Sequence, residues 1–571
     1  MKNGEIADVF DQVADLLEFQ GENPFRLRAY RNAATTLRDL TESVAKIAQD
    51  PERKLTDLPG VGKDLADKIV TLVTTGELPL LAELTAKTPP SVLILLRVPG
   101  LGPKKAAVLY KELQIGTLEQ LREACEAHRV RDLKGFGEKT EQKILDGLSL
   151  AATSEDRIYW ATADEYVQAM LEQLRKCKAV EQAEAAGSYR RRRETIGDLD
   201  LLVASSKPDV VMDHFGKFES VTGVIARGDT KMSVRLSGGL QVDLRVVPAE
   251  SFGAALQYFT GSKSHNVILR GRAKTKGLKI NEYGVYRGEE SIAGRTEKDV
   301  YAALGLPVFA PELREGRREF EWADEKKLPE LVELEDLRGD LHMHTDATDG
   351  KATLEEMIAA ARERGLAYIA ITDHSKRVSM ANGLDGPRLK RQWAKIDKLN
   401  EGLRDFKILK GVEVDILEKG GLDLEDEVLE GADWIVASVH YGQNQPREQI
   451  TKRIVDALKN PNVSAIAHPT GRIINRRKSY EVDLETVFKV ASDFGKLLEL
   501  NANPARLDLD DAACAGAKSH KIPIVISSDA HSTVGLDVLR YGVNQARRAG
   551  LTKADVANTR PWAEMKKLIG K

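Results

Sequence analysis

The chain has little of several features that mark other classes of protein. Its three cysteines lie far apart and none forms a Cys-x-x-Cys pair, which argues against a disulfide framework and a thiolate zinc site. It has no apolar run long enough to span a bilayer, and its N-terminus lacks the apolar segment of a signal peptide. We therefore expect a cytoplasmic protein in a reducing compartment, with no membrane partner.

An excess of charge of one sign is also absent. The formal net charge is −3 in 571 residues, so any contact with a nucleic acid must come from local basic patches and backbone amides. Hydrophobic residues make up 42% and charged residues 30% of the chain, which is typical of a globular protein. At this length we expect roughly three to five domains.

Changes of pattern along the chain predict the domain boundaries. The first part is helical with glycine turns, the middle mixes helices with β-branched strands, and a run dense in charge precedes the last part. We interpret that run as a linker and a flexible joint. The predicted segments are helical domains at 1–90 and 91–150, an α+β domain at 151–250, a smaller domain at 251–318, the charged linker at 319–336 and an α/β domain at 337–571.

The last part alternates strands with helices. Its expected strands are Ala367–Thr372, Lys407–Val414, Trp434–Val439, Ala465–Ala467, Lys496–Leu500 and Pro523–Ser527. Because helical patterns separate these strands, they predict repeated βα units and a parallel sheet, either open or closed as a barrel.

Histidine is scarce, with ten in the chain, yet six of them fall on one metal-ligand pattern in this last part. Together with nearby carboxylates the ligand-type residues are His342, His344, Asp349, His374, Glu413, His440, His468, Asp529 and His531. Most lie at or just past the end of an expected strand, where the loops of a barrel assemble active sites. Mixed imidazole and carboxylate ligands suit Mn, Zn or Fe, and their number suits a trinuclear site. A lone histidine is more often a satisfied core residue, but the set argues against that interpretation.

Three similar glycine turns occur in the helical part: Leu58-Pro-Gly-Val-Gly-Lys, Val98-Pro-Gly-Leu-Gly-Pro-Lys and Leu133-Lys-Gly-Phe-Gly-Glu-Lys. Each opens a helix, so its amides can receive a phosphate oxygen without reading a base. The turns resemble helix-hairpin-helix DNA-binding motifs; the alternative is three ordinary glycine-capped helix junctions. The predicted DNA-binding residues are Gly60, Gly62, Lys63, Gly100, Gly102, Lys104, Gly135 and Gly137.

A second set of carboxylates lies upstream. Asp198 and Asp200 form an Asp-x-Asp pair on an expected strand, where alternate side chains share a face, and Asp243 lies on a later strand. Hard oxygen ligands suit Mg²⁺ or Mn²⁺ bridging a triphosphate, and two such ions serve nucleotidyl transfer. The three aspartates are therefore predicted to be catalytic residues and metal ligands, rather than surface turn residues.

The surrounding sequence resembles family X DNA polymerases, of the DNA polymerase beta-like kind, over roughly residues 1–318. The resemblance rests on the Gly187-Ser188 turn before the aspartates and on the stretch Tyr258-Phe-Thr-Gly-Ser262 with Asn266 and Arg270 after it. It implies an α+β nucleotidyltransferase palm at 151–250 and a nucleotide-selecting thumb at 251–318. The residues it implies in nucleotide binding are Gly187, Ser188, Arg191, Gly197, Arg245, Tyr258, Phe259, Gly261, Lys263, Asn266 and Arg270.

The same resemblance implies roles for several of these residues. Ser188 and Arg191 would hold the triphosphate, and Asp243 would lie nearest the primer 3′-hydroxyl and accept its proton. Tyr258, Phe259 and Gly261 would line the sugar pocket and oppose a 2′-hydroxyl. Asn266 and Arg270 would approach the nascent base pair and template, and Arg245 would support the carboxylates.

Three further positions follow from comparison with the family pattern. Lys68 on the first hairpin helix matches a lyase lysine of eukaryotic relatives, and is a possible lyase nucleophile. Arg192 stands where the family often has glycine. Lys263 stands near the incoming base where relatives carry an acid, and we expect it to strengthen nucleotide binding.

The ligand pattern of the last part resembles the PHP (polymerase and histidinol phosphatase) family over about residues 337–571. The resemblance implies a distorted TIM-like βα barrel whose metals activate water against a phosphate ester, with Arg472 and Arg506 clamping phosphate. Mn²⁺ is the expected metal, with Zn²⁺ or Fe as alternatives. The implied groups are His342, His344, Glu413 and Asp529 for one metal, Glu413, His440 and His468 for a second, and Asp349, His374 and His531 for a third.

Together these patterns predict a DNA polymerase that fills short gaps in DNA repair, including base excision repair, and a 3′–5′ exonuclease. Activity as a 3′-phosphatase or at abasic sites is left open. The expected partners are gapped or primed DNA and dNTPs, and we expect a monomer. The alternatives are a phosphatase of a small phosphomonoester with a non-polymerising front half, and a non-enzymatic DNA-end scaffold. The hairpins argue against the first, and the complete ligand sets against the second.

Overall fold

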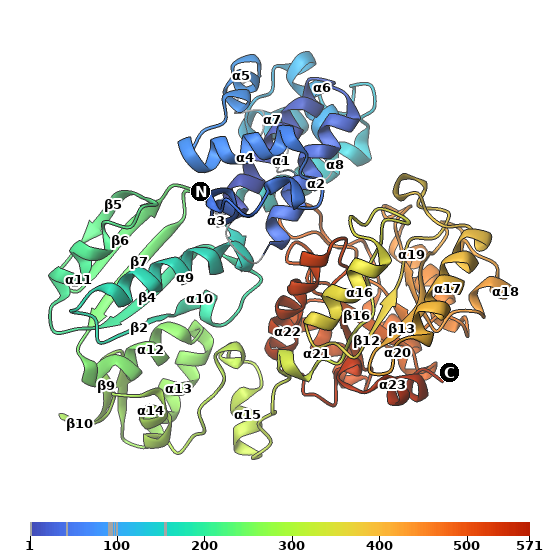
Figure 1. Cartoon of the computed structure of the whole chain (residues 1–571). Helices are drawn as coiled ribbons and strands as arrows, with labels where there is room; N and C mark the ends of the chain where they lie inside the picture. The colour runs from blue at the N-terminus through green and yellow to red at the C-terminus, as the bar shows by residue number, and fades with distance from the viewer. Residues whose placement is uncertain are drawn as a thin grey trace. The chain divides into compact units, whose positions relative to one another are not determined.

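The computed structural model describes residues 3–40, 44–88, 95, 98, 101–153 and 157–570. The chain folds as two compact units (Figure 1). One consists of Met1–Glu155, Glu333–Gly542 and Ala554–Lys571, and the other of Asp156–Val332 together with Val543–Lys553. The second unit therefore includes a short segment from near the C-terminus.

The front part is helical, as the sequence predicts. Helix α1 buries an apolar stripe that includes Ile6, Phe10 and Val13, and the ring of Phe10 packs edge-on against Tyr30 at 5.5 Å between centroids. Helices α1 to α5 enclose one core, and α6 to α8 enclose another. The helices are α1 (Asn3–Phe19), α2 (Pro24–Asp39), α3 (Val44–Gln49), α4 (Lys63–Thr75), α5 (Pro79–Lys87), α6 (Pro103–Leu113), α7 (Leu118–Glu126) and α8 (Glu138–Thr153).

A five-stranded sheet of order β2-β4-β7-β6-β5 forms the centre of the second unit. Its strands β4 and β7 pair in parallel, whereas the other neighbours are antiparallel. Apolar side chains of the sheet, α9 and α11 share one core. The elements are β1 (Ile158–Tyr159), α9 (Trp160–Lys176), β2 (Gln182–Ala185), α10 (Gly187–Arg190), β3 (Thr195–Ile196), β4 (Asp198–Ala204), α11 (Pro208–Phe215), β5 (Val221–Arg227), β6 (Lys231–Leu236) and β7 (Gln241–Val247).

The rest of this unit surrounds a smaller sheet of order β10-β9-β8. A separate core lies between this sheet and the helices beside it. The elements are α12 (Phe252–Thr260), α13 (Lys263–Thr275), β8 (Lys279–Asn281), β9 (Gly284–Arg287), β10 (Glu290–Ala293), α14 (Glu297–Ala303) and α15 (Glu319–Asp324).

The charged stretch from about Pro311 to Leu337 contains buried charged groups in its first part. Glu312, Arg314 and Glu319 are each no more than 2% exposed. Glu319 Oε1 lies 2.8 Å from Nδ1 of the buried His265, and Arg314 pairs with Glu297. Hydrogen-bond and ion-pair partners from elsewhere in the unit satisfy these groups, and the composition of the stretch does not reveal those partners.

The last part forms a seven-stranded parallel sheet in the order β11 to β17. The segments after the first and last strands meet, because Asp529 N–H donates to His342 O at 2.9 Å and His344 N–H donates to Ala530 O at 2.8 Å. The sheet is therefore a nearly closed barrel. The expected strands agree with the observed ones to within one residue at each end, and β11 is a strand that was not expected.

Helices alternate with the strands around this barrel. The elements are β11 (Gly339–Asp340), α16 (Leu354–Glu363), β12 (Tyr368–Ile371), α17 (Gly386–Glu401), β13 (Lys407–Asp415), α18 (Asp426–Leu429), β14 (Trp434–Ser438), α19 (Arg447–Lys459), β15 (Ala465–Ile466), α20 (Leu484–Asp493), β16 (Leu497–Asn501), α21 (Asp511–Ser519), β17 (Ile524–Ser527), α22 (Leu539–Arg548) and α23 (Trp562–Leu568).

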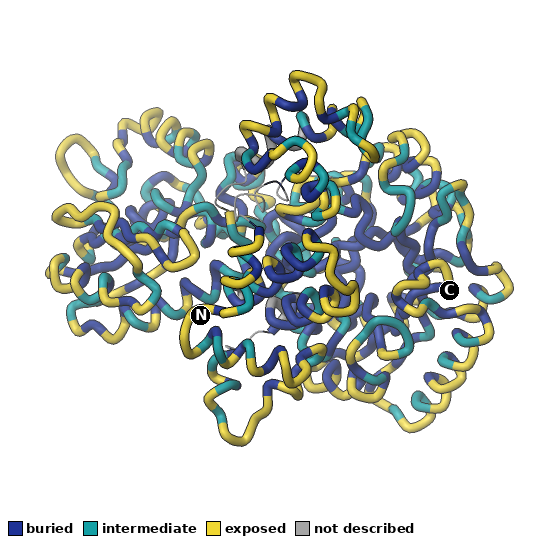
Figure 2. The backbone as a smooth tube through the Cα atoms, turned by 90° about the horizontal axis from the view of Figure 1, so that it is seen from above, coloured by how far each residue is buried: buried dark blue, intermediate teal, exposed yellow. Residues whose placement is uncertain are grey.

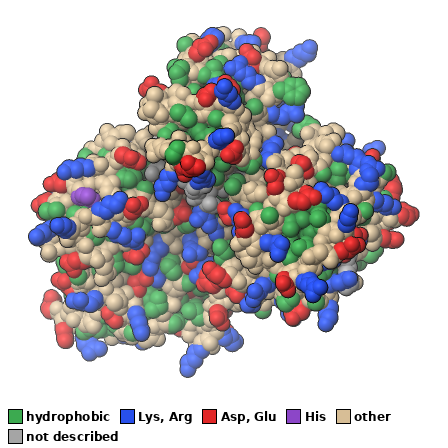
Figure 3. Space-filling model, viewed as in Figure 1, with side chains coloured by type: hydrophobic (Ala, Val, Ile, Leu, Met, Phe, Trp, Pro, Cys, Tyr) green, Lys and Arg blue, Asp and Glu red, His purple; other side chains and the backbone are tan. Residues whose placement is uncertain are grey.

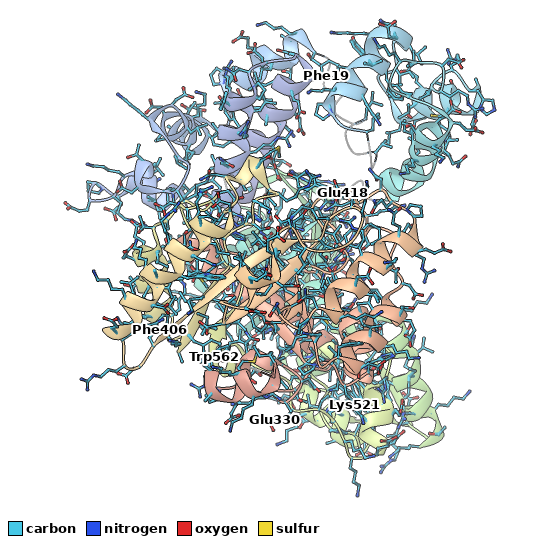
Figure 4. All side chains as sticks on the ribbon, turned by 90° about the vertical axis from the view of Figure 1, so that its right-hand side faces the viewer. Phe19, Glu330, Phe406, Glu418, Lys521 and Trp562 are labelled. Carbon is cyan, nitrogen blue, oxygen red and sulfur yellow. The ribbon has the colours of Figure 1, made fainter. Side chains whose placement is uncertain are left out.

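The two ends of the barrel differ. Every residue of β12, β14, β16 and β17 is buried; Figure 2 draws buried residues in dark blue. Trp562 of α23, labelled in Figure 4, lies 5.9 Å from the ring of Tyr368, the first residue of β12, so α23 packs at the amino ends of the strands. Phe406 and Glu418, also labelled, flank β13 at its amino and carboxyl ends. The ligand-type residues belong to the carboxyl end.

Charged side chains of both signs share the surface. Lys and Arg side chains are interspersed with Asp and Glu over the face drawn in Figure 3, in keeping with the small net charge of −3.

Among the described residues, no single helix is long and apolar enough to cross a membrane; the bent pair α4 and α5 passes that test by length and composition only when taken together.

Candidate active sites

Three aspartates gather on one face of the central sheet of the second unit. Asp200 of β4 lies opposite Asp243 of β7 in the parallel register, and Asp198 shares the face of Asp200 two residues earlier. Leu199 and Leu201 point the other way and are buried in the core, which holds the aspartates on the opposite face. The fold thus brings together the three carboxylates that the sequence analysis singled out.

The pKa values of Asp200 and Asp243 shift in opposite directions. Burial, followed by the negative charges of Asp198 and Asp243, raises the pKa of Asp200 to about 6. Burial also raises the pKa of Asp243, but hydrogen bonds, first of all from Lys231, outweigh burial and lower it. Lys231 Nζ lies 2.6 Å from Asp243 Oδ2, and Gln241 Nε2 donates to Asp243 Oδ1 at 3.0 Å. A crowded set of oxygen donors with excess negative charge fits Mg²⁺ or Mn²⁺.

The turn before the aspartates packs directly on them. Gly187 begins α10 with φ +61°, and a Cβ atom there would lie 2.4 Å from Asp200 Oδ2. Glycine is therefore required both by the backbone conformation and by the close approach. Ser188 follows within α10, and Gly197 immediately precedes β4, where a Cβ would lie 3.0 Å from Arg157 Nη1.

Two arginines of this turn are engaged inside the unit. Arg191, predicted to hold a triphosphate, donates from Nη1 to Thr260 O at 2.8 Å, and its Nε lies 3.1 Å from Glu315 Oε1. Arg192 has φ +55°, so the loop adopts a left-handed conformation although glycine is replaced.

The stretch after β7 is held together by one side chain. Asn266 Nδ2 donates to Tyr258 O at 2.7 Å and to Gly261 O at 3.2 Å. A Cβ at Gly261 would lie 2.7 Å from Asn266 Oδ1, so glycine permits this packing. The guanidinium of Arg245 lies 4.3 Å from the ring centre of Phe259 and links β7 to the same stretch. The predicted residues Lys263 and Arg270 are exposed on α13.

The glycine turns of the front part each precede a helix. Gly60 and Gly135 have φ of +75° and +87°, and Gly62, Gly102 and Gly137 stand directly before α4, α6 and α8. Among the described residues, nothing lies within 4 Å of a Cβ added at these last three positions, which leaves room for a phosphate backbone. Lys63 and Lys104 are exposed, and Gly100 lies outside the described residues.

Lys68, the possible lyase nucleophile, is partly buried on α4. Its Nζ pairs with the carboxylate of Asp64 one turn earlier, and its side chain is 19% exposed. A role in lyase chemistry stays a prediction.

The ligand-type residues of the barrel converge at the carboxyl ends of its strands, with Glu413 at their centre. Glu413 Oε2 lies 2.8 Å from His374 Nδ1, 3.5 Å from His342 Nε2 and 3.6 Å from His344 Nε2. Its Oε1 lies 3.1 Å from His468 Nε2 and 3.3 Å from His440 Nε2. Each carboxylate oxygen therefore faces a different group of histidines, as a bridging ligand would.

Two aspartates complete the cluster. Asp349 Oδ2 lies 3.5 Å from both His374 Nε2 and His531 Nε2, and Asp529 Oδ1 lies 3.2 Å from His344 Nε2. Ligand atoms lie within 4.8 Å of one another in three groups: His344, Asp349, His374 and His531; His342, His344 and Asp529; and His374, Glu413 and His440. The barrel thus brings all of the predicted ligand residues to one site.

The donor atoms of this cluster fit metal ions. Several buried atoms make no hydrogen bond of acceptable geometry among the described residues, although two of them, His374 Nδ1 and Glu413 Oε2, lie 2.8 Å apart: His342 Nε2, His344 Nδ1, Asp349 Oδ1, His374 Nδ1, Glu413 Oε2 and His468 Nδ1. Leaving such groups unsatisfied costs about 1–3 kcal/mol each. Metal coordination removes this cost, and a mixed set of imidazole nitrogens and carboxylate oxygens suits Mn, Zn or Fe.

The charged groups of the cluster shift one another's pKa. Burial raises the pKa of Asp529 and Glu413, but the imidazoles around them outweigh burial and hold both well below the usual range. Burial, and then His531 and His374, lowers the pKa of His344 to about 4. Burial also lowers the pKa of His374 and His531, but nearby carboxylates outweigh burial and raise it to about 10 and about 9, so these two imidazoles carry protons that a metal ion would displace.

Carboxylates that the sequence analysis missed orient the histidines. Glu499 Oε1 lies 2.6 Å from His342 Nδ1, and its Oε2 accepts from the His468 amide at 2.6 Å. Asp415 Oδ1 lies 3.1 Å from His440 Nδ1. Such contacts fix the imidazole ring and leave the other nitrogen for a metal. One signal was available, because Glu499 lies on the one expected strand, Lys496–Leu500, that was assigned no ligand.

The two arginines predicted to clamp phosphate differ in position. Arg506 Nε lies 3.9 Å from Asp529 Oδ2, at the edge of the cluster. Arg472 donates to Leu507 O and lies 3.8 Å from Asp510 Oδ2. Arg506 is thus the arginine of the two that directly faces a ligand residue.

Models of four protein families match parts of the chain. They are a helix-hairpin-helix domain at residues 1–78, a SAM-like helix-hairpin-helix tandem at 92–149, a DNA polymerase beta thumb at 255–315 and a PHP domain at 340–503. The matches follow the order in which the sequence patterns occur.

Curated proteins match it as well. The DNA polymerase/3′-5′ exonuclease PolX of Bacillus subtilis (strain 168) is 40% identical over 573 residues, which cover 100% of this chain and 99% of that protein. DNA polymerase lambda of Rattus norvegicus is 28% identical over 346 residues, 55% of this chain and 56% of that protein. A probable phosphatase of Thermoanaerobacter sp. (strain X514) is 33% identical over 233 residues, 38% of this chain and 89% of that protein.

The packing of Gly187 on Asp200 generates a prediction. We expect Gly187→Ala to displace the aspartate and to lower nucleotide incorporation on a primed template by roughly 100-fold, because small misplacements of reacting groups cost about that much. The measurement is single-turnover incorporation. Gly223→Ala in β5, where nothing described lies within 4 Å of an added Cβ, is the control and should match wild type. Equal rates for both variants would contradict the account.

The contacts of Glu499 lead to a second prediction, which concerns metal binding. Glu499→Gln replaces one acceptor oxygen by an NH₂ that faces a donor, either His342 Nδ1–H or the His468 amide, so we expect it to disturb a ligand histidine and weaken Mn²⁺ binding by about 10- to 100-fold. Titration of free Mn²⁺ by electron paramagnetic resonance measures this. Glu485→Gln on α20 is a matched control, because the Glu485 side chain is 77% exposed. Unchanged Mn²⁺ affinity in Glu499→Gln would show that Glu499 does not orient a ligand.

Proposed function

The chain belongs to the PolX family of bifunctional DNA polymerase/3′-5′ exonucleases, and on that premise we propose how its two sites divide the work. It is a family X DNA polymerase with a PHP-domain exonuclease, and it binds DNA and depends on divalent metals. In the proposal, the carboxylate site of the second unit fills short gaps in damaged DNA. The barrel cluster trims 3′ ends. The observation that carries the proposal is that both ligand sets are complete in one chain that matches a PolX protein from end to end.

At the polymerase site, Asp198, Asp200 and Asp243 would hold Mg²⁺ or Mn²⁺. Such ions, when bound, neutralise charge on the triphosphate and favour ionisation of the attacking hydroxyl. Asp243 is the candidate for accepting the proton of the primer 3′-hydroxyl, because hydrogen bonds, first from Lys231, keep its carboxylate ionised. Lys231 also orients that carboxylate, through the 2.6 Å contact to Oδ2.

Selection of the nucleotide is proposed to involve the turn and the stretch on either side of the aspartates. Gly187, Ser188 and Arg191 would receive the triphosphate, while Tyr258, Phe259 and Gly261 would oppose a 2′-hydroxyl. Asn266 supports that stretch through its two bonds to backbone carbonyls. Lys263 and Arg270, exposed on α13, would reach the nucleotide, base pair or template.

At the barrel site, the cluster around Glu413 would hold Mn²⁺, with Zn²⁺ or Fe as alternatives. Bound metals there supply a water activated for attack on a phosphate ester. Glu499 and Asp415 hold the histidines in place, and Arg506 stands where a phosphate oxygen would need a cation. Removal of a 3′-phosphate and cleavage at an abasic site use the same attack on a phosphate ester.

One observation favours a second function of the barrel. The protein of Thermoanaerobacter sp. that matches 38% of this chain is described as a probable phosphatase, so hydrolysis of a small phosphomonoester is the candidate. The end-to-end match to a PolX protein and the complete carboxylate site support the polymerase as the main function of the whole chain.

Separate loss of the two activities is the test. A 5′-labelled primer on singly gapped DNA with Mn²⁺ should lengthen when dNTPs are present and shorten when they are absent. Asp243→Asn removes a metal ligand and the proton acceptor. It is expected to lower the rate of lengthening by more than about 100-fold while shortening continues. His344→Ala should do the reverse. The products are read on a sequencing gel.

Two outcomes would overturn the proposal. A wild-type protein that neither extends nor shortens the primer, yet releases phosphate from a small phosphomonoester, would establish the phosphatase. Loss of both activities in each folded single variant would show that the two sites do not act separately.

A further inference from the structure

The second unit contains a segment that the sequence assigns to the PHP domain. Residues Val543–Lys553, which include the end of α22, belong to this unit, whereas their neighbours on both sides belong to the other. Val332 N–H donates to Leu551 O at 3.0 Å, and Leu331 forms an antiparallel bridge with Thr552. A Cβ at Gly550 would lie 2.7 Å from the ring of Trp322. The segment is thus packed and hydrogen-bonded as an integral part of the unit.

Two carboxylates, the buried Glu312 and the partly buried Glu315, join this segment to the turn that begins at Gly187. Glu315 Oε1 lies 3.1 Å from Arg191 Nε and 2.9 Å from Arg548 Nη1. Glu312 Oε1 lies 3.2 Å from Arg192 Nε and 2.8 Å from Arg547 Nε. Each carboxylate therefore lies between one arginine of the turn and one arginine of α22.

Burial makes the loss of one partner from these bridges costly. The side chain of Glu312 is 2% exposed and that of Arg548 is 3% exposed. In such surroundings Coulomb attraction is weakly screened, and the loss of one partner leaves an uncompensated charge. Burial raises the pKa of Glu315, but Arg191 and then Arg548 outweigh burial and lower it, which keeps the carboxylate ionised.

Two further contacts from α22 hold the turn itself. Arg548 Nη1 donates to the backbone oxygen of Arg191 at 2.6 Å, and Arg192 Nη1 donates to Asn544 Oδ1 at 2.5 Å. Arg192 has φ +55°, a conformation that is costly for a residue other than glycine and persists only where its surroundings hold it. These contacts are available to do so.

We propose that the segment 543–553, and Arg548 above all, positions the nucleotide-binding turn of the polymerase site. The inference rests on the proposed polymerase function. Arg548 is a positioning residue, since it contacts the turn and Glu315 rather than the substrate. Gly187 at the start of the same turn packs on Asp200, so a shift of the turn changes the site that receives the triphosphate relative to the aspartates. A part of the PHP domain in sequence is then a structural part of the polymerase.

The test uses the full-length protein on singly gapped DNA and compares dNTP KM and kcat of wild type, Arg548→Ala and Arg548→Lys. We expect Arg548→Ala to raise the dNTP KM by about tenfold or more, with a smaller change in kcat, because it releases the turn. Arg548→Lys should recover most of the loss, since an ammonium group donates to both the same carbonyl and the same carboxylate. Exonuclease activity, measured on the same preparations, should stay within about twofold of wild type.

The control removes a positive charge elsewhere in the PHP domain. Lys567→Ala, at an exposed position of α23, should leave both activities unchanged. A wild-type dNTP KM in Arg548→Ala overturns the inference, and so does a parallel fall of polymerase and exonuclease, which marks general destabilisation.

A milder variant tests the same inference if Arg548→Ala does not fold. Asn544→Ala removes the acceptor of Arg192 alone, so a dNTP KM raised severalfold supports the inference and an unchanged KM overturns it. A wild-type protein that does not extend primers contradicts the proposed function itself. Extension by wild type that is indifferent to both substitutions contradicts the inference alone.

Discussion

Parallel pairing between neighbouring strands is the constraint on which both sites depend. In the second unit, β4 and β7 pair in parallel within a sheet that is otherwise antiparallel, and their register sets Asp200 against Asp243. A slip of one residue would turn Asp243 into the core. In the barrel, parallel strands bring residues as far apart as His342 and His531 to a common rim, because their carboxyl ends all meet there.

Both sites also concentrate charge that the protein alone does not neutralise. Burial and the two neighbouring aspartates raise the pKa of Asp200 to about 6, because ionising a third carboxylate there is unfavourable. In the barrel, buried atoms such as Glu413 Oε2 and His342 Nε2 have no hydrogen-bond partner among the described residues. Nearby residues offset part of the free-energy cost of these buried groups: Lys231 pairs with Asp243, and Glu499 with His342. The negative charge and the unpaired donor atoms that remain are what a metal site requires.

Much of this was predictable from the sequence, for physical reasons. Six of the seven barrel strands were predicted to within one residue because buried parallel strands are continuous apolar runs between helices, whereas β11, of two residues, forms no such run. The ligand residues were recognisable because histidine is scarce and carboxylates stood at strand ends. Lys231 was not predictable, since its contact to Asp243 depends on the pairing of β6 with β7. The contacts of Glu312 and Glu315 were not predictable either, because their partners Arg547 and Arg548 lie more than 200 residues away in the sequence.

The central claim is that one chain holds two distinct metal sites, one at the aspartates and one at the barrel rim. Crystals of the full chain with gapped DNA, a non-hydrolysable dNTP and Mn²⁺, measured at the Mn absorption edge, test it most directly. The account predicts anomalous peaks between Asp198, Asp200 and Asp243, and a separate group of peaks around Glu413. Anomalous peaks at only one of these two places, or only elsewhere on the surface, would contradict it.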